Sequence, residues 1–107
     1  MRSDTIRGHL DSIILRLLMD GDKYGYQISK DIAAWTNEAF QIKEATLYAV
    51  FQRLERRELI ESYQGEKSHG GKRKYYTITT LGKAYFHEAA KEWKEAKQLI
   101  DVFMEGV

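Results

Sequence analysis

Apolar residues in the first half of the chain recur at helical spacing. In residues 4–19 they fall at i, i+3, i+4, i+7 and i+8, which predicts an amphipathic helix that Gly21 ends in a left-handed turn. The same periodicity predicts a second helix over residues 24–35 and a third over residues 42–57. The polar segment 36–41 joins these two helices, so the pattern indicates a helix-turn-helix unit.

Two positions of the second predicted helix carry further information. Gly25 lies between Tyr24 and Tyr26 and lowers helix stability by roughly 1 kcal/mol relative to alanine, which predicts a close backbone contact at this position. Trp35 falls on the same side of the helix as Ile28. We therefore expect Trp35 in the core of the domain.

The third predicted helix has two different faces. Four apolar residues at helical spacing are expected to enter the core: Leu47, Val50, Phe51 and Leu54. The opposite face is small near its start, polar beyond it, and edged by hydroxyls and a cation: Ala45, Ala49, Gln52 and Arg56, with Thr46, Tyr48 and Arg53 at the edges. Such a face suits close approach to a polyanion, and the helix N-terminus adds partial positive charge. The sequence therefore predicts a recognition helix.

Some of these side chains also have a purely structural interpretation. Tyr48 is either a phosphate contact or a tyrosine at the edge of the core, and Thr46 is either a DNA contact or a local hydroxyl at the helix start. The arginines at the end of the helix are expected to form a solvated face, paired with neighbouring glutamates. The residues of this face are Arg53, Arg56 and Arg57, with Glu55 and Glu58.

After residue 58 the helical period stops. Residues 59–64 and 74–79 are rich in Ile, Tyr and Thr and are separated by glycines, which predicts an antiparallel hairpin. Its inward residues are expected to be Ile60, Tyr76 and Ile78. Its tip and returning strand carry cations without an intervening acid: Lys67, Lys72, Arg73 and Lys74. A cationic hairpin beside a recognition helix is typical of a wing that contacts phosphate, although a solubilising loop would have the same charges.

The last predicted element is one long helix over residues 80–104, capped by Thr79. One apolar seam runs along it through Tyr85, Ala89, Trp93, Ala96, Ile100 and Phe103. At about 1.5 Å per residue this helix is nearly 40 Å long, which exceeds what a small head can cover. We therefore expect a second copy to pack on the seam in a two-fold dimer.

Trp93 on this seam has two interpretations. A tryptophan in such a position is usually a core residue of the dimer. Small residues one turn away on each side, Ala89 and Ala96, would leave a gap between two paired indoles that suits a flat aromatic molecule. An effector site is hypothesised there, with Ile100 and Phe103 as walls and Asp101 as a polar contact.

Composition narrows the remaining classes of function. The 107 residues suffice for one core, with a head over residues 1–79 and the long helix over residues 80–107. The chain has no cysteine and a net charge of +1, so local clusters of charge matter more than the total. Neither a membrane-spanning apolar run nor an apolar signal core in residues 1–10 is present. These features predict a cytoplasmic protein without a membrane partner.

The sequence gives little support to catalysis. His9, His69 and His87 fall on three different predicted elements, without a histidine at i+3 or i+4 that would complete a metal site. Gly70-Gly71 is a turn rather than a phosphate-binding loop. We expect no enzyme activity, no metal and no cofactor.

Three stretches in order, GHLDSIILRLLMDGDKYGYQISKDI, ATLYAVFQRLERRELI and GGKRKYYTITTLGK, resemble the PadR family of winged-helix transcriptional regulators. The resemblance covers nearly the whole chain and is to the short form of the family, which has a single C-terminal dimerisation helix. The YGY, TLY and wing-to-helix motifs of the family are matched here. There are three departures: Ala49 where the family commonly has proline, Glu58 where it often has glycine, and no proline before the YGY motif, where the family frequently has one.

The resemblance implies an α+β, mainly α fold: a winged helix-turn-helix with a long C-terminal dimerisation helix. It implies a homodimeric repressor that binds inverted-repeat operator DNA and is released by a small aromatic or drug-like effector. The residues it places on DNA are Tyr24, Lys43, Thr46, Tyr48, Lys72, Arg73 and Lys74. The alternative is a winged-helix module that binds another protein and has no specific affinity for DNA.

Overall fold

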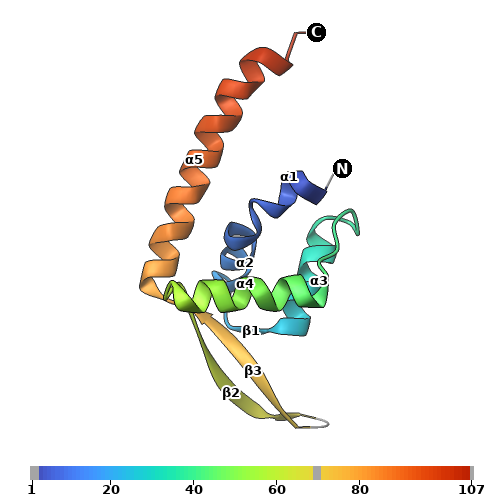
Figure 1. The fold of residues 1–107 in the computed structure, drawn as a ribbon, viewed down its shortest axis with the longest axis vertical. Helices are drawn as coiled ribbons and strands as arrows, with labels where there is room; N and C mark the ends of the chain where they lie inside the picture. The colour runs from blue at the N-terminus through green and yellow to red at the C-terminus, as the bar shows by residue number, and fades with distance from the viewer. Residues whose placement is uncertain (1–2, 69–70, 107) are drawn as a thin grey trace.

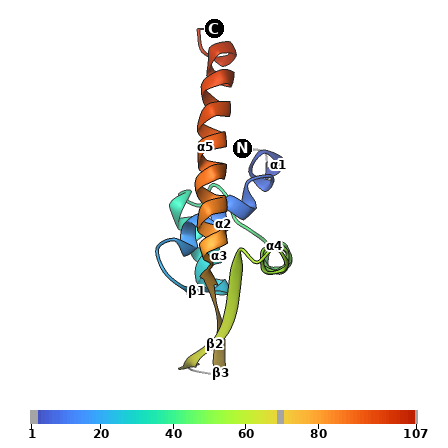
Figure 2. The ribbon, with the colours of Figure 1, turned by 90° about the vertical axis from the view of Figure 1, so that its left-hand side faces the viewer.

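A computed structural model describes residues 3–68 and 71–106. Along the chain the elements are α1 (Ser3–Arg7), α2 (Leu10–Leu18), β1 (Lys23–Tyr24), α3 (Gly25–Trp35), α4 (Glu44–Arg56), β2 (Ile60–Ser68), β3 (Gly71–Ile78) and α5 (Thr80–Met104). Four helices and the three-stranded sheet form a head from which α5 rises on one side, while the β2-β3 hairpin projects from the opposite end (Figures 1 and 2). This arrangement confirms the expected winged helix-turn-helix.

The N-terminal helix is broken, whereas a single helix over residues 4–19 was expected. α1 ends at Arg7 and α2 begins at Leu10. At the break the His9 amide donates to the Ile6 carbonyl at 2.8 Å, a tight turn that replaces regular helical bonding. Gly8 has poor helix propensity, which favours the interruption here.

The core lies where the helices of the head meet the sheet. The four residues predicted for the inner face of α4, Leu47, Val50, Phe51 and Leu54, are all buried. The ring of Phe51 stacks on that of Tyr76 in β3, with ring centroids 4.0 Å apart. Ile60 is also buried and Ile78 packs against the core, which confirms the inward face of the hairpin.

Trp35 is not a core residue, contrary to expectation. Its side chain is 58% exposed, and the Arg16 guanidinium lies 5.1 Å from its ring. Ile28 and Ile32 in the same helix are buried. Trp35 is the last residue of α3. Its spacing from Ile28 and Ile32 matches the core side of the helix, but its side chain lies outside the core.

The sheet is antiparallel, with strand order β1-β3-β2. The expected hairpin is confirmed, but its strands are longer than the segments 59–64 and 74–79 and contain a register shift between Gln64 and Lys67. β1 was not anticipated, because two residues are too few to show alternation. It pairs Lys23 with Tyr76 and Tyr24 with Tyr75, and so attaches the start of α3 to the wing.

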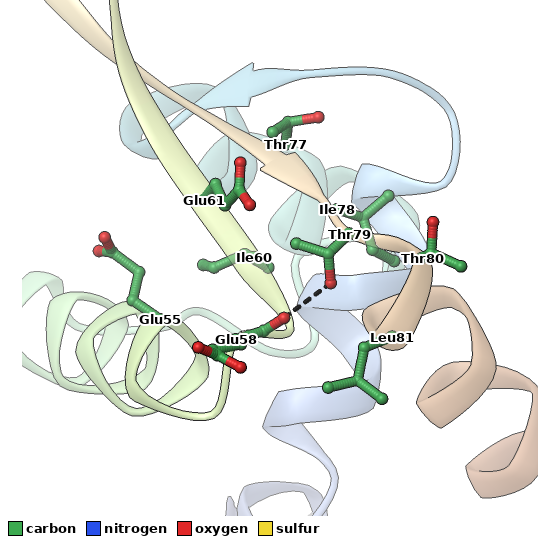
Figure 3. A pocket seen from close by; sticks show the side chains of 9 residues that line it. All are labelled: Glu55, Glu58, Ile60, Glu61, Thr77, Ile78, Thr79, Thr80 and Leu81. Atoms are coloured by element: carbon green, nitrogen blue, oxygen red, sulfur yellow. Dashed lines mark hydrogen bonds between the residues drawn. The ribbon is translucent and has the colours of Figure 1, made fainter.

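The side chain of Thr79 links α4, the wing and α5 through hydrogen bonds to the backbone. The Thr79 hydroxyl donates to the Glu58 carbonyl at 2.8 Å (Figure 3). It also accepts from the Gly82 amide at 2.9 Å, which confirms Thr79 as the cap of α5. A Cβ on Gly82 would lie 2.1 Å from the Leu59 carbonyl oxygen, so only glycine fits. Glu58 has φ +60°, the left-handed conformation that glycine adopts most easily.

Beyond the head, α5 extends far from the other elements (Figure 1). The expected helix boundaries are confirmed, and every residue from Lys91 to Ile100 is exposed, including the part of the expected apolar seam that lies there. Near the C-terminus five large apolar side chains are 52–77% exposed: Leu99, Ile100, Val102, Phe103 and Met104. Within the described residues, no helix combines the length and apolarity needed to cross a bilayer.

Candidate nucleic-acid interface

The start of α4 presents the predicted recognition surface. Lys43 is the N-cap residue and is exposed, and Thr46 is partly exposed one turn later. All four residues of the predicted outward face, Ala45, Ala49, Gln52 and Arg56, are exposed. The first turns of α4 therefore offer a small, open surface next to a helix N-terminus.

Tyr48 connects this surface to α3. Its side chain is 43% exposed and its ring meets Phe51 edge-on at 5.6 Å. A Cβ on Gly25 would lie 3.0 Å from the Tyr48 hydroxyl oxygen, so Gly25 lets Tyr48 pack tightly against the start of α3. The close approach predicted for Gly25 is confirmed, although a side chain rather than a backbone makes it. Tyr48 thus has both a core-edge contact and an open surface.

The wing brings two of the predicted DNA-binding residues together. The Arg73 guanidinium lies 4.2 Å from the centre of the Tyr24 ring, and Tyr24 meets Tyr75 edge-on at 5.6 Å. Lys74 is exposed, and its Nζ lies 5.5 Å from the centre of the Tyr76 ring. The side chain of Lys72, like that of Lys67, lies outside the described part of the structure. Arg73 and Lys74 therefore place two cations on β3, beside β1.

Two arginines on the second half of α4 are paired differently from the sequence prediction. Arg53 Nε donates to Asp11 Oδ1 at 3.2 Å, Arg53 Nη2 donates to the same oxygen, and Arg57 Nη1 donates to Asp11 Oδ2 at 3.1 Å. The hydrogen bonds with Asp11 raise the pKa of Arg53. The expected partner Glu55 instead accepts from the Ser62 hydroxyl at 3.2 Å. Local spacing could not reveal Asp11, since it precedes Arg53 by 42 residues.

An open hollow of about 790 Å³ lies where α4, β2, β3 and the start of α5 meet (Figure 3). Glu55, Glu58 and Glu61 line it together with threonines. Three carboxylates in one place repel phosphate. This side of the head, which includes the base of the wing, is therefore unsuited to the DNA backbone. The start of α4 and the wing cations Arg73 and Lys74 remain as the candidate interface.

A second hollow, of about 590 Å³, is an apolar groove between α5 and the first three helices. Trp35, Phe40, Phe86 and Trp93 supply its aromatic lining, and the rings of His9 and Trp93 meet edge-on at 5.0 Å. We call this hollow the α5 groove.

The structure separates the residues predicted for an effector. Ala89 and Trp93 line the α5 groove. Ala96, Ile100 and Phe103 lie farther along α5 and are exposed, and Asp101 accepts from Lys97 Nζ at 2.8 Å. Among the described residues, no group of three or more histidines and carboxylates is arranged to hold a metal ion.

Comparison with known proteins identifies the family. Residues 14–88 match the model of the transcriptional regulator PadR-like family. The chain belongs to this family. PadR-like proteins are transcriptional regulators, so the protein is a DNA-binding regulator and not an enzyme. The matched segment contains α4 and the wing and ends at residue 88, before Trp93.

Similar proteins match the chain over most or all of its length. An uncharacterized protein of Lysinibacillus sphaericus is 67% identical over 107 residues, which are 100% of this chain and 98% of that protein. The structure of a transcriptional regulator from Clostridium thermocellum is 47% identical with a TM-score of 0.90, over 98% of this chain and 99% of that one. A PadR family transcription regulator from Clostridium difficile is 35% identical with a TM-score of 0.79, over 90% and 98%.

The Tyr76 ring, which stacks on Phe51 of α4, carries a phenol whose pKa is raised. Burial, together with the charge of Glu55, raises the pKa of Tyr76 to about 12 from the usual value of 10. The folded protein thus holds the phenolic proton more tightly than the unfolded chain does. This contribution to stability is complete below pH 10 and is lost as pH rises to about 12.

We predict that the free energy of unfolding falls more steeply between pH 10 and 12 in the wild type than in Tyr76→Phe, which has no phenol to ionise at this site. Denaturant titrations across this pH range measure the difference. Tyr26→Phe is the control, because Tyr26 is 66% exposed, and it should follow the wild type. Equal pH slopes for Tyr76→Phe and wild type would contradict the prediction.

Proposed function

We propose that the protein is a homodimeric transcriptional repressor that binds an inverted-repeat operator in the cytoplasm. One observation supports this proposal most directly: the first half of α4 is exposed, and the cations of the wing accompany it. The chain belongs to the PadR-like family, which agrees with this role. A face of small residues such as Ala45 and Ala49 allows the helix to enter a major groove closely.

The two parts of this surface have different roles in the proposal. Lys43, Thr46 and Tyr48 contact base edges or nearby phosphates from the start of α4. Arg73 and Lys74, with Lys72, hold the flanking backbone and contribute affinity without sequence preference. Tyr24 lies under Arg73 and supports the guanidinium that reaches the phosphate.

Dimerisation is proposed from the exposed apolar residues of α5. Leu99, Val102 and Phe103 are all more than two-thirds exposed, and the α5 groove provides an apolar surface of the same character. A second copy can cover both surfaces at once, because a two-fold axis lets each α5 lie in the groove of the other subunit. The two heads would then read half-sites about 10 base pairs apart.

The proposed effector is a small planar aromatic molecule held between the two α5 helices. In this proposal Trp93 supplies the stacking surface between the small residues Ala89 and Ala96. Ile100 and Phe103 form the walls, and Asp101 is a polar contact. Such a ligand changes operator affinity only if it prefers one crossing of the helices over another, since that crossing sets the separation of the heads.

Replacing wing cations tests DNA binding against the alternative of a protein-binding module. In a plot of the logarithm of the DNA association constant K against the logarithm of salt concentration, Arg73→Ala and Lys74→Ala should each make the slope less steep by about 0.9. This is the value for one lost phosphate contact. Fluorescence anisotropy with labelled duplex measures this slope. Lys94→Ala removes an exposed cation of α5 and should leave the slope unchanged. Unchanged slopes in the wing variants would favour a protein partner instead.

Phe103→Asp tests the dimer. Burying an unpaired carboxylate costs about 3 kcal/mol, so we expect the dimer dissociation constant to rise roughly 100-fold. Sedimentation equilibrium measures the mass, and circular dichroism should show a retained fold. Lys94→Asp introduces the same group nine residues before Phe103, on the opposite side of α5, and should remain dimeric. A Phe103→Asp variant with the mass and dissociation constant of the wild type would exclude this interface.

Tryptophan fluorescence tests the effector site with the planar dye proflavine as a probe. Only Trp35 and Trp93 are present, so Trp35→Phe leaves Trp93 as the sole reporter. We expect proflavine to quench Trp93 in that variant with wild-type affinity. Trp93→Ala should lower affinity roughly tenfold, because a stacking surface is lost. Unchanged affinity in Trp93→Ala rules out this site.

A further inference from the structure

One carboxylate, on Asp11 of α2, engages two arginines of the recognition helix. Arg53 and Arg57 have side chains that are 44% and 43% exposed, whereas the Asp11 side chain is only 16% exposed. Both guanidinium groups reach the same carboxylate: Arg53 in α4 donates to Oδ1, and Arg57, the C-cap residue of α4, donates to Oδ2. The pairing therefore joins a fixed acid in the head to two long, partly exposed cations on α4.

The position of Arg53 on α4 relates this pairing to DNA. Arg53 follows Thr46 by seven residues, or two helical turns, so the two lie along the same edge of α4. When a recognition helix lies in a major groove, its edges run beside the phosphate strands that border the groove. A guanidinium at this edge would bind phosphate with the same paired donors that it gives to a carboxylate.

Arg57 extends the pairing to α5. Its guanidinium lies 4.6 Å from the centre of the Tyr85 ring, in addition to its hydrogen bond with Asp11. Tyr85 is partly buried against the core. Arg57 is thus restrained by an anion on one side and an aromatic face on the other.

We propose that Asp11 is a specificity-determining residue that holds Arg53 and Arg57 away from the DNA backbone and thereby limits binding to non-operator DNA. Phosphate contacts add the same affinity on every sequence, so occupying two arginines internally lowers general binding and leaves base contacts by α4 dominant. This inference rests on the proposed docking of α4 in the major groove.

The test compares Asp11→Asn with the wild type on a non-operator duplex. The variant keeps the shape of the side chain and removes the charge that holds the arginines. We expect tighter binding at low salt and a log K against log salt slope steeper by roughly 1 to 2, for one or two new phosphate contacts. Loss of a merely structural contact would lower the melting temperature without steepening this slope.

Asp20→Asn is a matched control, because it changes the net charge equally and removes the salt bridge to Arg16 in the same part of the chain. It should leave the slope unchanged. Adding Arg53→Gln and Arg57→Gln to Asp11→Asn should restore the wild-type slope. An Asp11→Asn slope equal to that of Asp20→Asn would overturn the proposal.

The two arginine substitutions with Asp11 intact give an independent answer if Asp11→Asn folds poorly. We expect them to leave the slope on non-operator DNA unchanged, since Asp11 already occupies both groups. A flatter slope would show that the arginines contact DNA in the wild type, and Asp11 would not restrain them. Failure of the wild type to bind any duplex is a different result, which would refute the proposed function itself.

Discussion

The stacking of Phe51 on Tyr76 is the contact on which the arrangement of the head depends. It fixes α4 to β3, while β1 attaches the start of α3 to the same strand. Both helices of the helix-turn-helix are therefore positioned by one strand of the wing. An aromatic pair buries a large area with a defined geometry. Together with the other buried residues of α4 it fixes the inner face of the helix, and small and polar side chains occupy the exposed outer face.

Periodicity was sufficient to predict the long elements. The inner face of α4, the hairpin and the 25 residues of α5 each repeat their pattern often enough to be recognised. Three local features were not predicted from the sequence, each for a physical reason. β1 is too short to show the alternation of apolar and polar residues that marks a strand. The turn at Gly8 and His9 interrupts the helix while the apolar spacing continues across it. Trp35 has the spacing of a core residue but lies at the end of its helix, where its side chain is left exposed.

The candidate site was only partly predictable, because its charges are arranged across distant segments. The cations of the wing are neighbours in sequence and could be recognised directly. Asp11 meets Arg53 and Arg57 only through the packing of α2 beside α4, and the three glutamates of the acidic hollow come from α4, the following turn and β2. The net charge of +1 does not reveal that the cations of the wing and the glutamates of the hollow lie in different places.

The join between the wing and α5 has a mechanical consequence. Ile78 ends β3 and Thr80 begins α5, so Thr79 alone separates them, and its hydroxyl ties the join to the end of α4. Because no flexible linker separates β3 from α5, the direction of α5 is coupled to the position of the wing and of the end of α4. A small change in the direction of α5 near its C-terminus therefore also rotates the head.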